Sequence, residues 1–330
     1  MGEGVLLAAI ALVTGFLTCA ATGAIIPVLR RQNMLDHPNE RSSHSMPTPR
    51  GGGIALISAL LLAWLALSQM GAVAPGIVGI SLAAAALAVI CWIDDLRGLS
   101  PWSRLLAQGA AVAFGISCLP ETTVPVAGRL GSVYLTGLGL LWVWWINLFN
   151  FMDGIDGLAG AEAAAIGVGM LFFATFGVGT DSELRLLAST IVGAAIGFLV
   201  WNWSPARIFL GDVGSAPLGY LLGFLLLALA LRGFWKIALI LPLYFLADAT
   251  ITLTRRLLRG ERVWQAHREH YYQQAVRRGL RHTSVVKRVI AADILLTACG
   301  WASENGWGAV SLGLSVVIVT GLLVSLSHSR

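Results

Sequence analysis

The chain has 330 residues, of which 57% are hydrophobic and 12% are charged, and its formal net charge is +5. This balance excludes an ordinary water-soluble globular domain and is typical of a protein that lies in a lipid bilayer. The positive charge does not indicate a nucleic-acid partner, because the cytoplasmic loops that orient a membrane protein carry the same excess of Lys and Arg.

Eleven predominantly apolar stretches follow one another along the chain. Each approaches the roughly 20 residues that a helix needs to cross about 30 Å of hydrocarbon. Because a backbone in lipid must satisfy its own hydrogen bonds, and these stretches do not alternate as barrel strands do, we predict helices. The expected fold is all-α, a polytopic transmembrane helical bundle of about eleven spans in a single domain over residues 1–330. The stretches cover residues 4–29, 54–70, 76–93, 105–118, 133–149, 160–178, 186–200, 217–231, 234–253, 286–301 and 308–326.

The distribution of basic residues predicts the orientation of the bundle. With eleven spans, 18 of the 22 Lys and Arg residues fall on connecting segments of one side. The positive-inside rule makes this side cytoplasmic, with the N-terminus outside and the C-terminus inside. Since polar residues also gather on that side, we expect the active site to face the cytoplasm.

Asp94 and Asp95 end the third stretch, and Arg104 opens the fourth. Two neighbouring carboxylates at a hydrocarbon boundary are costly and repel each other, which makes a functional site the default hypothesis. Adjacent helical residues point about 100° apart, so we expect the pair to address two partners rather than to chelate one ion. The structural alternative is a helix-end ion pair with Arg97 or Arg104.

Four polar side chains occur within ten residues at the end of the fifth stretch: Asn147, Asn150, Asp153 and Asp156. On a helix their spacing of three drifts by about 60° at each step, so the four side chains can converge only if the helix breaks. Gly154 and Gly157 supply such a break. We therefore expect two amides and two carboxylates to converge beside a cytoplasmic cavity. The alternative, a capped helix terminus, accounts for only one of the four groups.

Asp212 stands between Gly211 and Gly214, and glycines allow the backbone to approach a ligand closely. The alternative role for Asp212 is to cap the helix that follows. Together with Asn150 and the two neighbouring aspartates, Asp212 suits Mg²⁺, which takes oxygen ligands and borrows some of them from substrate phosphates and water.

The long loop over residues 254–285 is rich in Arg and contains His267, Arg268 and His270. Guanidinium forks match phosphate oxygens, so this loop is a candidate clamp for a diphosphate. The same charges would equally result from positive-inside orientation or from contact with anionic lipid.

Three polar residues outside these groups complete the set of candidates. Arg50 precedes three glycines in the first cytoplasmic loop, whose backbone would suit a phosphate or a nucleotide. Asp248 and Asp293 lie inside apolar stretches, where we expect structural pairing.

Taken in chain order, these segments resemble the polyprenyl-phosphate N-acetylhexosamine-1-phosphate transferase superfamily, glycosyltransferase family 4, over nearly the whole chain. The matching pieces are the Pro47-Thr48-Pro49-Arg50-Gly51-Gly52-Gly53 loop, Asp94 and Asp95 with a basic residue at Arg104, the Asn-x-x-Asn-x-x-Asp-Gly-x-Asp-Gly segment from Asn147, the Gly-Asp at Asp212 and the His-containing last loop. The resemblance implies an enzyme of the bacterial cytoplasmic (inner) membrane. Such an enzyme transfers a sugar 1-phosphate from a UDP-sugar to undecaprenyl phosphate, releases UMP and requires Mg²⁺.

The resemblance also assigns roles to individual residues. Asp212 matches the metal carboxylate and Asn150 its companion ligand. Asp94 and Asp95 fall where the family activates the lipid phosphate, Arg104 stands at a position often held by lysine, and Asp153 and Asp156 line the nucleotide and metal region. The remaining candidates, for substrate binding, are Arg50, Asn147, His267, Arg268 and His270.

Two segments favour one branch of the family. The spacing His267-Arg268-Glu269-His270 departs from the compact His clusters of the peptidoglycan branch, and Arg41-Ser42-Ser43-His44 precedes the glycine-rich loop. Both look more like the branch that starts O-antigen and related surface glycans. The sugar stays open among N-acetylglucosamine, N-acetylgalactosamine and 6-deoxy-N-acetylhexosamines, and the oligomeric state, a homodimer included, stays open as well.

A secondary transporter is the competing class, because carboxylates in a membrane also relay protons or bind cations. Transporter sites lie near the bilayer midplane, often between related halves of the chain. Here the carboxylates gather at one face and no internal repeat is visible. The sequence therefore favours the enzyme.

Overall fold

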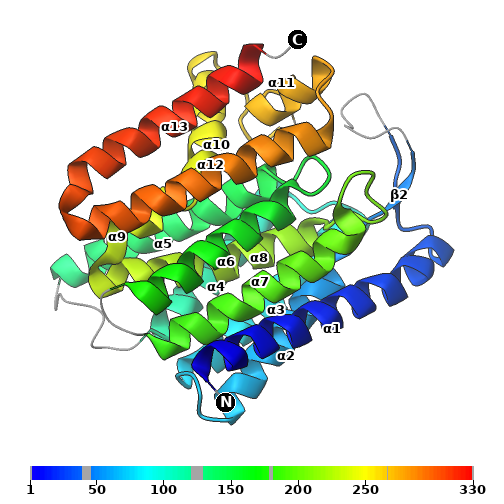
Figure 1. Ribbon diagram of the computed structural model, residues 1–330. Helices are drawn as coiled ribbons and strands as arrows, with labels where there is room; N and C mark the ends of the chain where they lie inside the picture. Colours follow the sequence, from blue (N-terminus) through cyan, green and yellow to red (C-terminus); the bar gives the residue numbers. More distant parts are fainter. Residues whose placement is uncertain (1, 39–45, 120–128, 178–180, 266, 329–330) are drawn as a thin grey trace.

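Long helices form most of the chain, as the apolar stretches predict (Figure 1). The computed structural model describes residues 2–38, 46–119, 129–177, 181–265 and 267–328. The helices in chain order are α1 (Glu3–Arg31), α2 (Gly53–Gln69), α3 (Gly76–Arg97), α4 (Pro101–Ser117), α5 (Arg129–Phe151), α6 (Leu158–Phe176), α7 (Ser182–Asn202), α8 (Asp212–Leu229), α9 (Trp235–Ile240), α10 (Leu243–Leu258), α11 (Tyr271–Arg277), α12 (His282–Ala302) and α13 (Gly308–His328). Within the described ranges, the strands are β1 (Leu35–Asp36) and β2 (Thr48–Pro49), which pair antiparallel.

Seven helical segments of the described chain are long and apolar enough to cross a membrane. The last of them, His282–His328, contains two helices, because Asn305 and Gly306 leave the helical conformation and α13 folds back along α12 (Figure 1). The predicted stretch 234–253 is also divided, since α9 ends before Pro242 and α10 begins after it. The helical bundle is thus confirmed, and the number of eleven spans stays a prediction.

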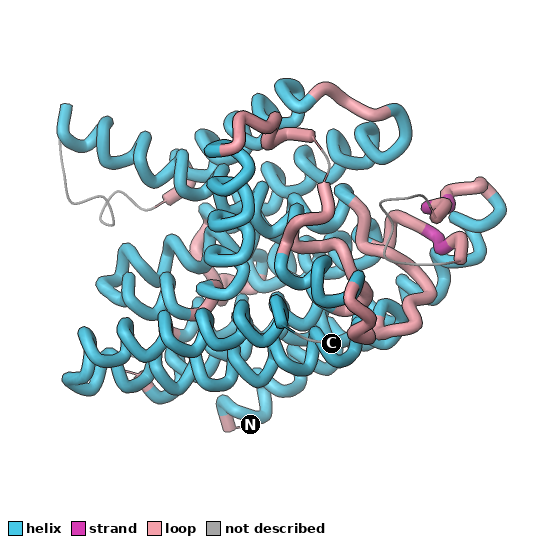
Figure 2. The backbone as a smooth tube through the Cα atoms, turned by 90° about the horizontal axis from the view of Figure 1, so that it is seen from above, coloured by secondary structure: helices cyan, strands magenta, loops and turns pink. Residues whose placement is uncertain are grey.

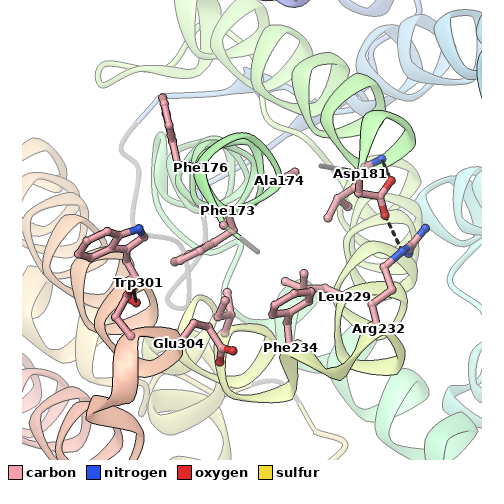
Figure 3. Close-up of a pocket in the computed structure, with 13 residues that line it drawn as sticks. Phe173, Ala174, Phe176, Asp181, Leu229, Arg232, Phe234, Trp301 and Glu304 are labelled. Carbon is pink, nitrogen blue, oxygen red and sulfur yellow. Dashed lines mark hydrogen bonds and ion pairs between the residues drawn. The ribbon is translucent and has the colours of Figure 1, made fainter. Parts of the chain in front are cut away.

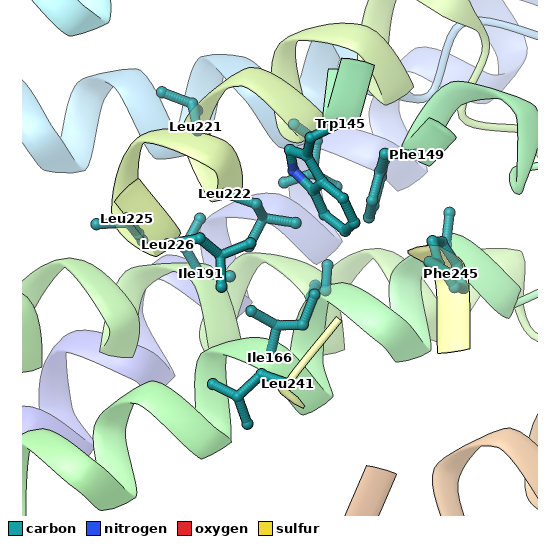
Figure 4. Packing of buried hydrophobic residues seen from close by; sticks show 14 of the residues in the cluster. Trp145, Phe149, Ile166, Ile191, Leu221, Leu222, Leu225, Leu226, Leu241 and Phe245 are labelled. Atoms are coloured by element: carbon teal, nitrogen blue, oxygen red, sulfur yellow. The ribbon is translucent and has the colours of Figure 1, made fainter. Parts of the chain in front are cut away.

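The core of the bundle is centred on α8, which is almost entirely buried. Large apolar side chains from four other helices belong to the same buried cluster: Trp145 and Phe149 from α5, Ile166 from α6, Ile191 from α7, and Phe245 from α10, which lies against Phe149 (Figure 4). Small residues line the most extensive helix contact, between α1 and α7. A Cβ atom on Gly193 would lie 2.2 Å from the carbonyl oxygen of Ala11, so only glycine fits there.

The polar connections gather at one end of the bundle. The two strands and the longest loops lie together on one side in Figure 2, and in Figure 1 β2 and α11 lie at the same end. The C-terminal end of α13 lies there too, because Arg278 donates to the carbonyl oxygen of Leu326. The N-terminus lies at the far end, where Glu3 pairs with Arg185 of α7. One end of the fold therefore carries nearly all the predicted site residues.

Candidate active site

Polar side chains from five segments, four of them charged, meet at the polar end of the bundle. Asp95 at the end of α3 lies 2.6 Å from the Arg50 guanidinium, and the same guanidinium lies 3.2 Å from Asp212 at the start of α8. Arg104 of α4 lies 3.5 Å from Asp94 and 3.8 Å from Asp212. Asn150 at the end of α5 donates to Asp212 at 3.0 Å. The structure therefore brings together six of the predicted residues, and we call them, with Asp153, the acidic cluster.

The glycine-rich loop places Arg50 in this cluster. Residues 49–53 run beside residues 209–211, with a bridge between Arg50 and Phe209 and hydrogen bonds of 2.8–3.2 Å to the carbonyl oxygens of Phe209 and Leu210. A Cβ atom on Gly53 would lie 2.1 Å from the Cα atom of Gly214. Two glycine backbones thus touch here, which explains why the loop needs glycine and how Arg50 reaches Asp212.

Asp94 and Asp95 address different partners, as their positions on a helix predict. Asp95 is buried, and it caps α8 by accepting from the backbone N–H groups of Asp212 at 3.3 Å and Val213 at 3.0 Å. Asp94 accepts from the N–H of Leu99 at 2.5 Å and pairs with Arg104. The helix-end ion pair with Arg104 is therefore present alongside the links to the cluster.

The carboxylate of Asp212 is more accessible than those of Asp94 and Asp95. Its side chain is 24% exposed, whereas that of Asp95 is 1% exposed. Because Asp95 fills the capping position of α8, the Asp212 carboxylate is left to face Arg50, Arg104 and Asn150. A partly exposed carboxylate held between two cations and an amide is suited to meet a phosphate-bound cation.

The segment after α5 breaks as predicted, but its polar groups do not all converge. Gly157 has a left-handed backbone with φ of 78°, and α6 starts after it. Asp153 lies beside the cluster: burial and the charge of Asp212 raise its pKa well above the usual range, while Arg50 acts in the opposite direction. Asn150 and Asp153 thus meet the expectation.

The positions of Asn147 and Asp156 contradict the predicted convergence of the four polar groups. Asn147 points toward α4, where it donates to Gln108 at 2.6 Å. Asp156 accepts from the N–H of Ala206 at 3.2 Å and lies 3.2 Å from Nδ1 of His282. Burial alone would raise the pKa of Asp156, but His282 and the hydrogen bonds from Ser204 and Ala206 together outweigh it, so the pKa is lowered. The expected convergence of four groups is therefore wrong for these two.

The last loop also differs from a simple clamp. His270 is buried, its Nδ1 lies 3.2 Å from Asp248 and it caps α11. Its ring packs 4.8 Å from that of His267. Burial, with the neighbouring His270 and Arg256, lowers the pKa of His267 to about 4, so His267 is neutral near pH 7. Any cationic clamp at this loop therefore depends on its arginines, Arg268 among them.

The two acids inside apolar stretches have different surroundings. Asp248 accepts from Tyr244, Thr252 and the backbone of α11, so structural pairing is confirmed. Asp293 of α12 is buried, and its carboxylate has no hydrogen-bond partner among the described residues; the same holds for Glu162 on the adjoining α6. The predicted pairing of Asp293 is thus not a hydrogen bond among the described residues, although Glu162 lies close enough for the two carboxyl charges to act on each other.

Several residues of the site carried no signal in the sequence. Ser215 accepts from Asn150 at 2.7 Å, one turn into α8. Tyr272 donates to the carbonyl oxygen of Phe151 at 2.9 Å, and His282 contacts Asp156. A lone Ser, Tyr or His at a helix end is common, so these roles become visible only in three dimensions. The segment 41–44, one of the two segments that favoured the O-antigen branch, lies outside the described residues. Arg50 and the glycines that follow it are described.

The oxygen donors of the cluster fit Mg²⁺. Asp212 and Asp153 are carboxylates close enough for the charge of one to act on the other. Asn150 donates its amide nitrogen to Asp212, so its amide oxygen is the atom that could bind a cation. Among the described residues no three His, Cys, Asp or Glu side chains form a ready metal site. Two or three protein oxygens suit Mg²⁺, because it commonly completes its octahedron with substrate phosphates and water.

A separate, largely apolar pocket lies at the far end of the bundle (Figure 3). Phe173, Phe234 and Trp301 line it, and Asp181 pairs with Arg232 at its edge. No residue of the acidic cluster lines this pocket. Its shape and position therefore do not bear on the chemistry of the cluster.

Several proteins named as transferases are similar to this chain over most of its length. A probable undecaprenyl-phosphate N-acetylglucosaminyl 1-phosphate transferase of Bacillus subtilis is 26% identical over 89% of this chain and 87% of its own length. A decaprenyl-phosphate N-acetylglucosaminephosphotransferase of Mycobacterium leprae is 28% identical over 96% and 89%. A phospho-N-acetylmuramoyl-pentapeptide-transferase of a Synechococcus strain is 31% identical over 84% and 86%. Residues 77–230, which span α3 to α8 and hold most of the acidic cluster, match glycosyl transferase family 4, and the chain belongs to this family of polyprenyl-phosphate N-acetylhexosamine-1-phosphate transferases.

Proposed function

We propose that this phosphoglycosyltransferase moves an N-acetylhexosamine 1-phosphate, or its 6-deoxy form, from a UDP-sugar to undecaprenyl phosphate. The observation that carries the proposal is the convergence of Arg50, Arg104 and Asp212 with three further carboxylates at one end of an apolar bundle. A polar cluster at the end of membrane-spanning helices can meet a water-soluble nucleotide and a lipid phosphate at once. The product, a lipid-linked sugar diphosphate, would start a surface glycan of the O-antigen type.

The reaction asks the protein for positioning and charge more than for covalent chemistry. An oxygen of the lipid phosphate forms a bond to the β-phosphorus of the UDP-sugar. The bond from the β-phosphorus to the bridging oxygen breaks, and its electron pair leaves with UMP. Arg50 and Arg104 would hold phosphate oxygens, while Asp94 and Asp95 keep these two guanidinium groups in place. Asp95 would act through Arg50, since it is buried behind it.

Mg²⁺ would be held by Asp212, with Asn150 and Asp153 beside it. Bound there, the ion supplies charge neutralisation for the diphosphate. The protein's own part is to hold Asp212 toward the open side of the cluster, which the hydrogen bond from Asn150 and the cap of α8 by Asp95 both support. Nothing in this donor set favours a soft metal, because every candidate ligand is an oxygen.

The proposed setting is the bacterial inner membrane, with the acidic cluster in the cytoplasm and the N-terminus outside. The charge asymmetry of the loops supports this orientation, since 18 of the 22 Lys and Arg residues belong to one side of an eleven-span topology. A nucleotide sugar made in the cytoplasm would then reach the cluster directly.

Purified protein tests this proposal. It is incubated with undecaprenyl phosphate, Mg²⁺ and one UDP-sugar at a time: UDP-N-acetylglucosamine, UDP-N-acetylgalactosamine and a 6-deoxy analogue. Release of UMP that depends on the lipid phosphate is the expected result for at least one donor. If no donor gives UMP while the protein is folded and monodisperse, the proposed substrates are wrong.

A further inference from the structure

Asp153 lies in the loop of residues 152–157, between α5 and α6. Hydrogen bonds link one side of this loop to the segment that precedes α8. Gly157 donates its N–H to the side chain of Asn202 at 3.0 Å, and Ala206 donates to Asp156 at 3.2 Å. The side chain of Asn202 in turn donates to the carbonyl oxygen of Ile208 at 2.9 Å. The loop is thus linked to the same chain segment that leads into Asp212.

The other side of the loop is tied to the C-terminal part of the chain. Nδ1 of His282, at the start of α12, lies 3.2 Å from the Asp156 carboxylate and 3.4 Å from the Asp156 N–H. The shorter contact favours the ring form with a proton on Nδ1, which donates to the carboxylate. Tyr272 of α11 donates to the carbonyl oxygen of Phe151 at 2.9 Å, directly before the loop.

Tyr272 and His282, which make these contacts with Phe151 and Asp156, are themselves held by burial and, for Tyr272, by a further hydrogen bond. The Tyr272 side chain is fully buried, and its backbone N–H donates to Asp248 of α10. Asp248 itself is fully buried and holds His270 and Tyr271 as well. The imidazole of His282 is mostly buried between the loop and α12. The anchor therefore runs from α10 through α11 to the loop, and from α12 to the loop.

We propose that His282 is a positioning residue for the transfer reaction, which through Asp156 and with the help of Tyr272 fixes the loop 152–157 so that Asp153 faces Asp212. The loop contains Gly154 and Gly157, which give it little stiffness of its own. Misplacement of a reacting group by about 1 Å can cost a factor of 100 in rate. The role of Asp153 in this inference rests on the proposed function.

Three substitutions at one position test the role of the Nδ1 donor. His282→Ala removes the donor, His282→Gln carries an amide nitrogen near the position of Nε2, and His282→Asn carries one near the position of Nδ1. With a donor sugar that the wild type uses, we expect kcat to fall about 10-fold to 100-fold in the Ala and Gln variants. The Asn variant should keep kcat within about threefold of the wild type, since it restores the donor.

Tyr272→Phe provides a second test, with Tyr220→Phe as its matched control. Both tyrosines are buried and donate to a main-chain carbonyl oxygen, but Tyr220 binds Ala111 inside the bundle, away from the loop. We expect Tyr272→Phe to lower kcat several-fold, and Tyr220→Phe to leave it unchanged at similar thermal stability.

Hydrogen exchange separates this inference from the proposed function, because it needs no substrate. In His282→Ala, the amides of residues 152–157 should exchange at least about tenfold faster than in the wild type, while those of α8 do not change. If the Ala and Gln variants keep both wild-type kcat and wild-type exchange, His282 does not position the loop. If all three variants lose activity only in proportion to lost thermal stability, His282 is merely structural and the proposal is likewise wrong. A wild type without any UMP release would instead count against the proposed substrates.

Discussion

Replacing Asp212 by Asn separates the structural and the functional roles of this residue. The substitution keeps an oxygen that accepts from Asn150, and it keeps the size of the side chain. It removes one negative charge that lies 3.2 Å from Arg50 and 3.8 Å from Arg104. Folding and activity depend differently on that charge, so they should respond differently.

The effect on stability should be small. All three side chains are about a quarter to two fifths exposed, so each lost ion pair contributes at most about 1 kcal/mol to folding. Removal of the charge also relieves repulsion with Asp153, whose pKa is raised by burial and, in addition, by the charge of Asp212. The two terms oppose each other, and we expect the free energy of unfolding to change by less than about 1 kcal/mol. The cap of α8 stays, because Asp95 supplies it.

The effect on turnover should be large. Loss of one preorganised electrostatic group commonly lowers kcat by a factor of about 100 or more, equivalent to about 2.7 kcal/mol in the activation barrier. The assay is Mg²⁺-dependent release of UMP by purified protein. Near-normal turnover by Asp212→Asn would refute the metal role of Asp212 and weaken the whole mechanism.

Asp181→Asn is the matched control. Asp181 also stands at the start of a helix, its side chain is 22% exposed and it pairs with Arg232 at 2.5 Å. It lies at the far end of the bundle, by the pocket of Figure 3. Asp181→Asn should therefore keep wild-type turnover, which shows that loss of an ion-paired helix-start charge does not itself stop the reaction.

Three further predictions follow from the charges of the loops. Without Mg²⁺, Asp153→Asn should raise the melting temperature by about 2 °C, because the ionised carboxyl is disfavoured in the folded protein and stability falls as pH rises through its raised pKa. Asp156→Asn should lower the melting temperature by a similar amount, because the ionised form of Asp156 is favoured in the folded protein. Calorimetry at pH 7 checks both, and equal signs would contradict the assigned environments. For His267, whose pKa is lowered from 6.5 to about 4, the unfolded chain binds more protons in this range, so stability should fall as pH falls from about 6.5 to about 4. His267→Gln should flatten this part of the stability profile, and an unchanged profile would show that His267 is not buried as a neutral ring. In a variant without native cysteines, a membrane-impermeant reagent applied to intact cells should label Glu304→Cys but not Gln265→Cys, and the reverse pattern would overturn the proposed orientation.

The sequence predicted the acidic cluster well, because its members occupy helix ends on one side of a single topology. Asp94 and Asp95 end α3, Asp212 begins α8 and Asn150 lies near the end of α5. Helix ends on one side of a bundle are brought together by any compact packing of the helices. The prediction therefore needed only the apolar pattern and the order of the loops.

Residues whose partners lie on a neighbouring helix could not be placed in this way. Asn147 and Asn150 are three residues apart and differ by about 60° around α5, which is enough to direct one to Gln108 of α4 and the other to Asp212 of α8. The sequence does not say which helix lies on which side of α5. The same reasoning applies to His270, because its partner Asp248 lies 22 residues earlier in a stretch that looks like an ordinary span.

The charge balance of the cluster constrains how a nucleotide diphosphate can bind. Four carboxylates, from Asp94, Asp95, Asp153 and Asp212, face two guanidinium groups, from Arg50 and Arg104. With every carboxyl ionised the cluster is negative by two charges. Burial raises the pKa of Asp153, and the charges of Asp212 and Asp95 raise it further. Two phosphates cannot approach such a group without added positive charge. A divalent cation between Asp212 and the diphosphate offsets the excess, and this electrostatic requirement supports the proposed need for Mg²⁺ independently of the family resemblance.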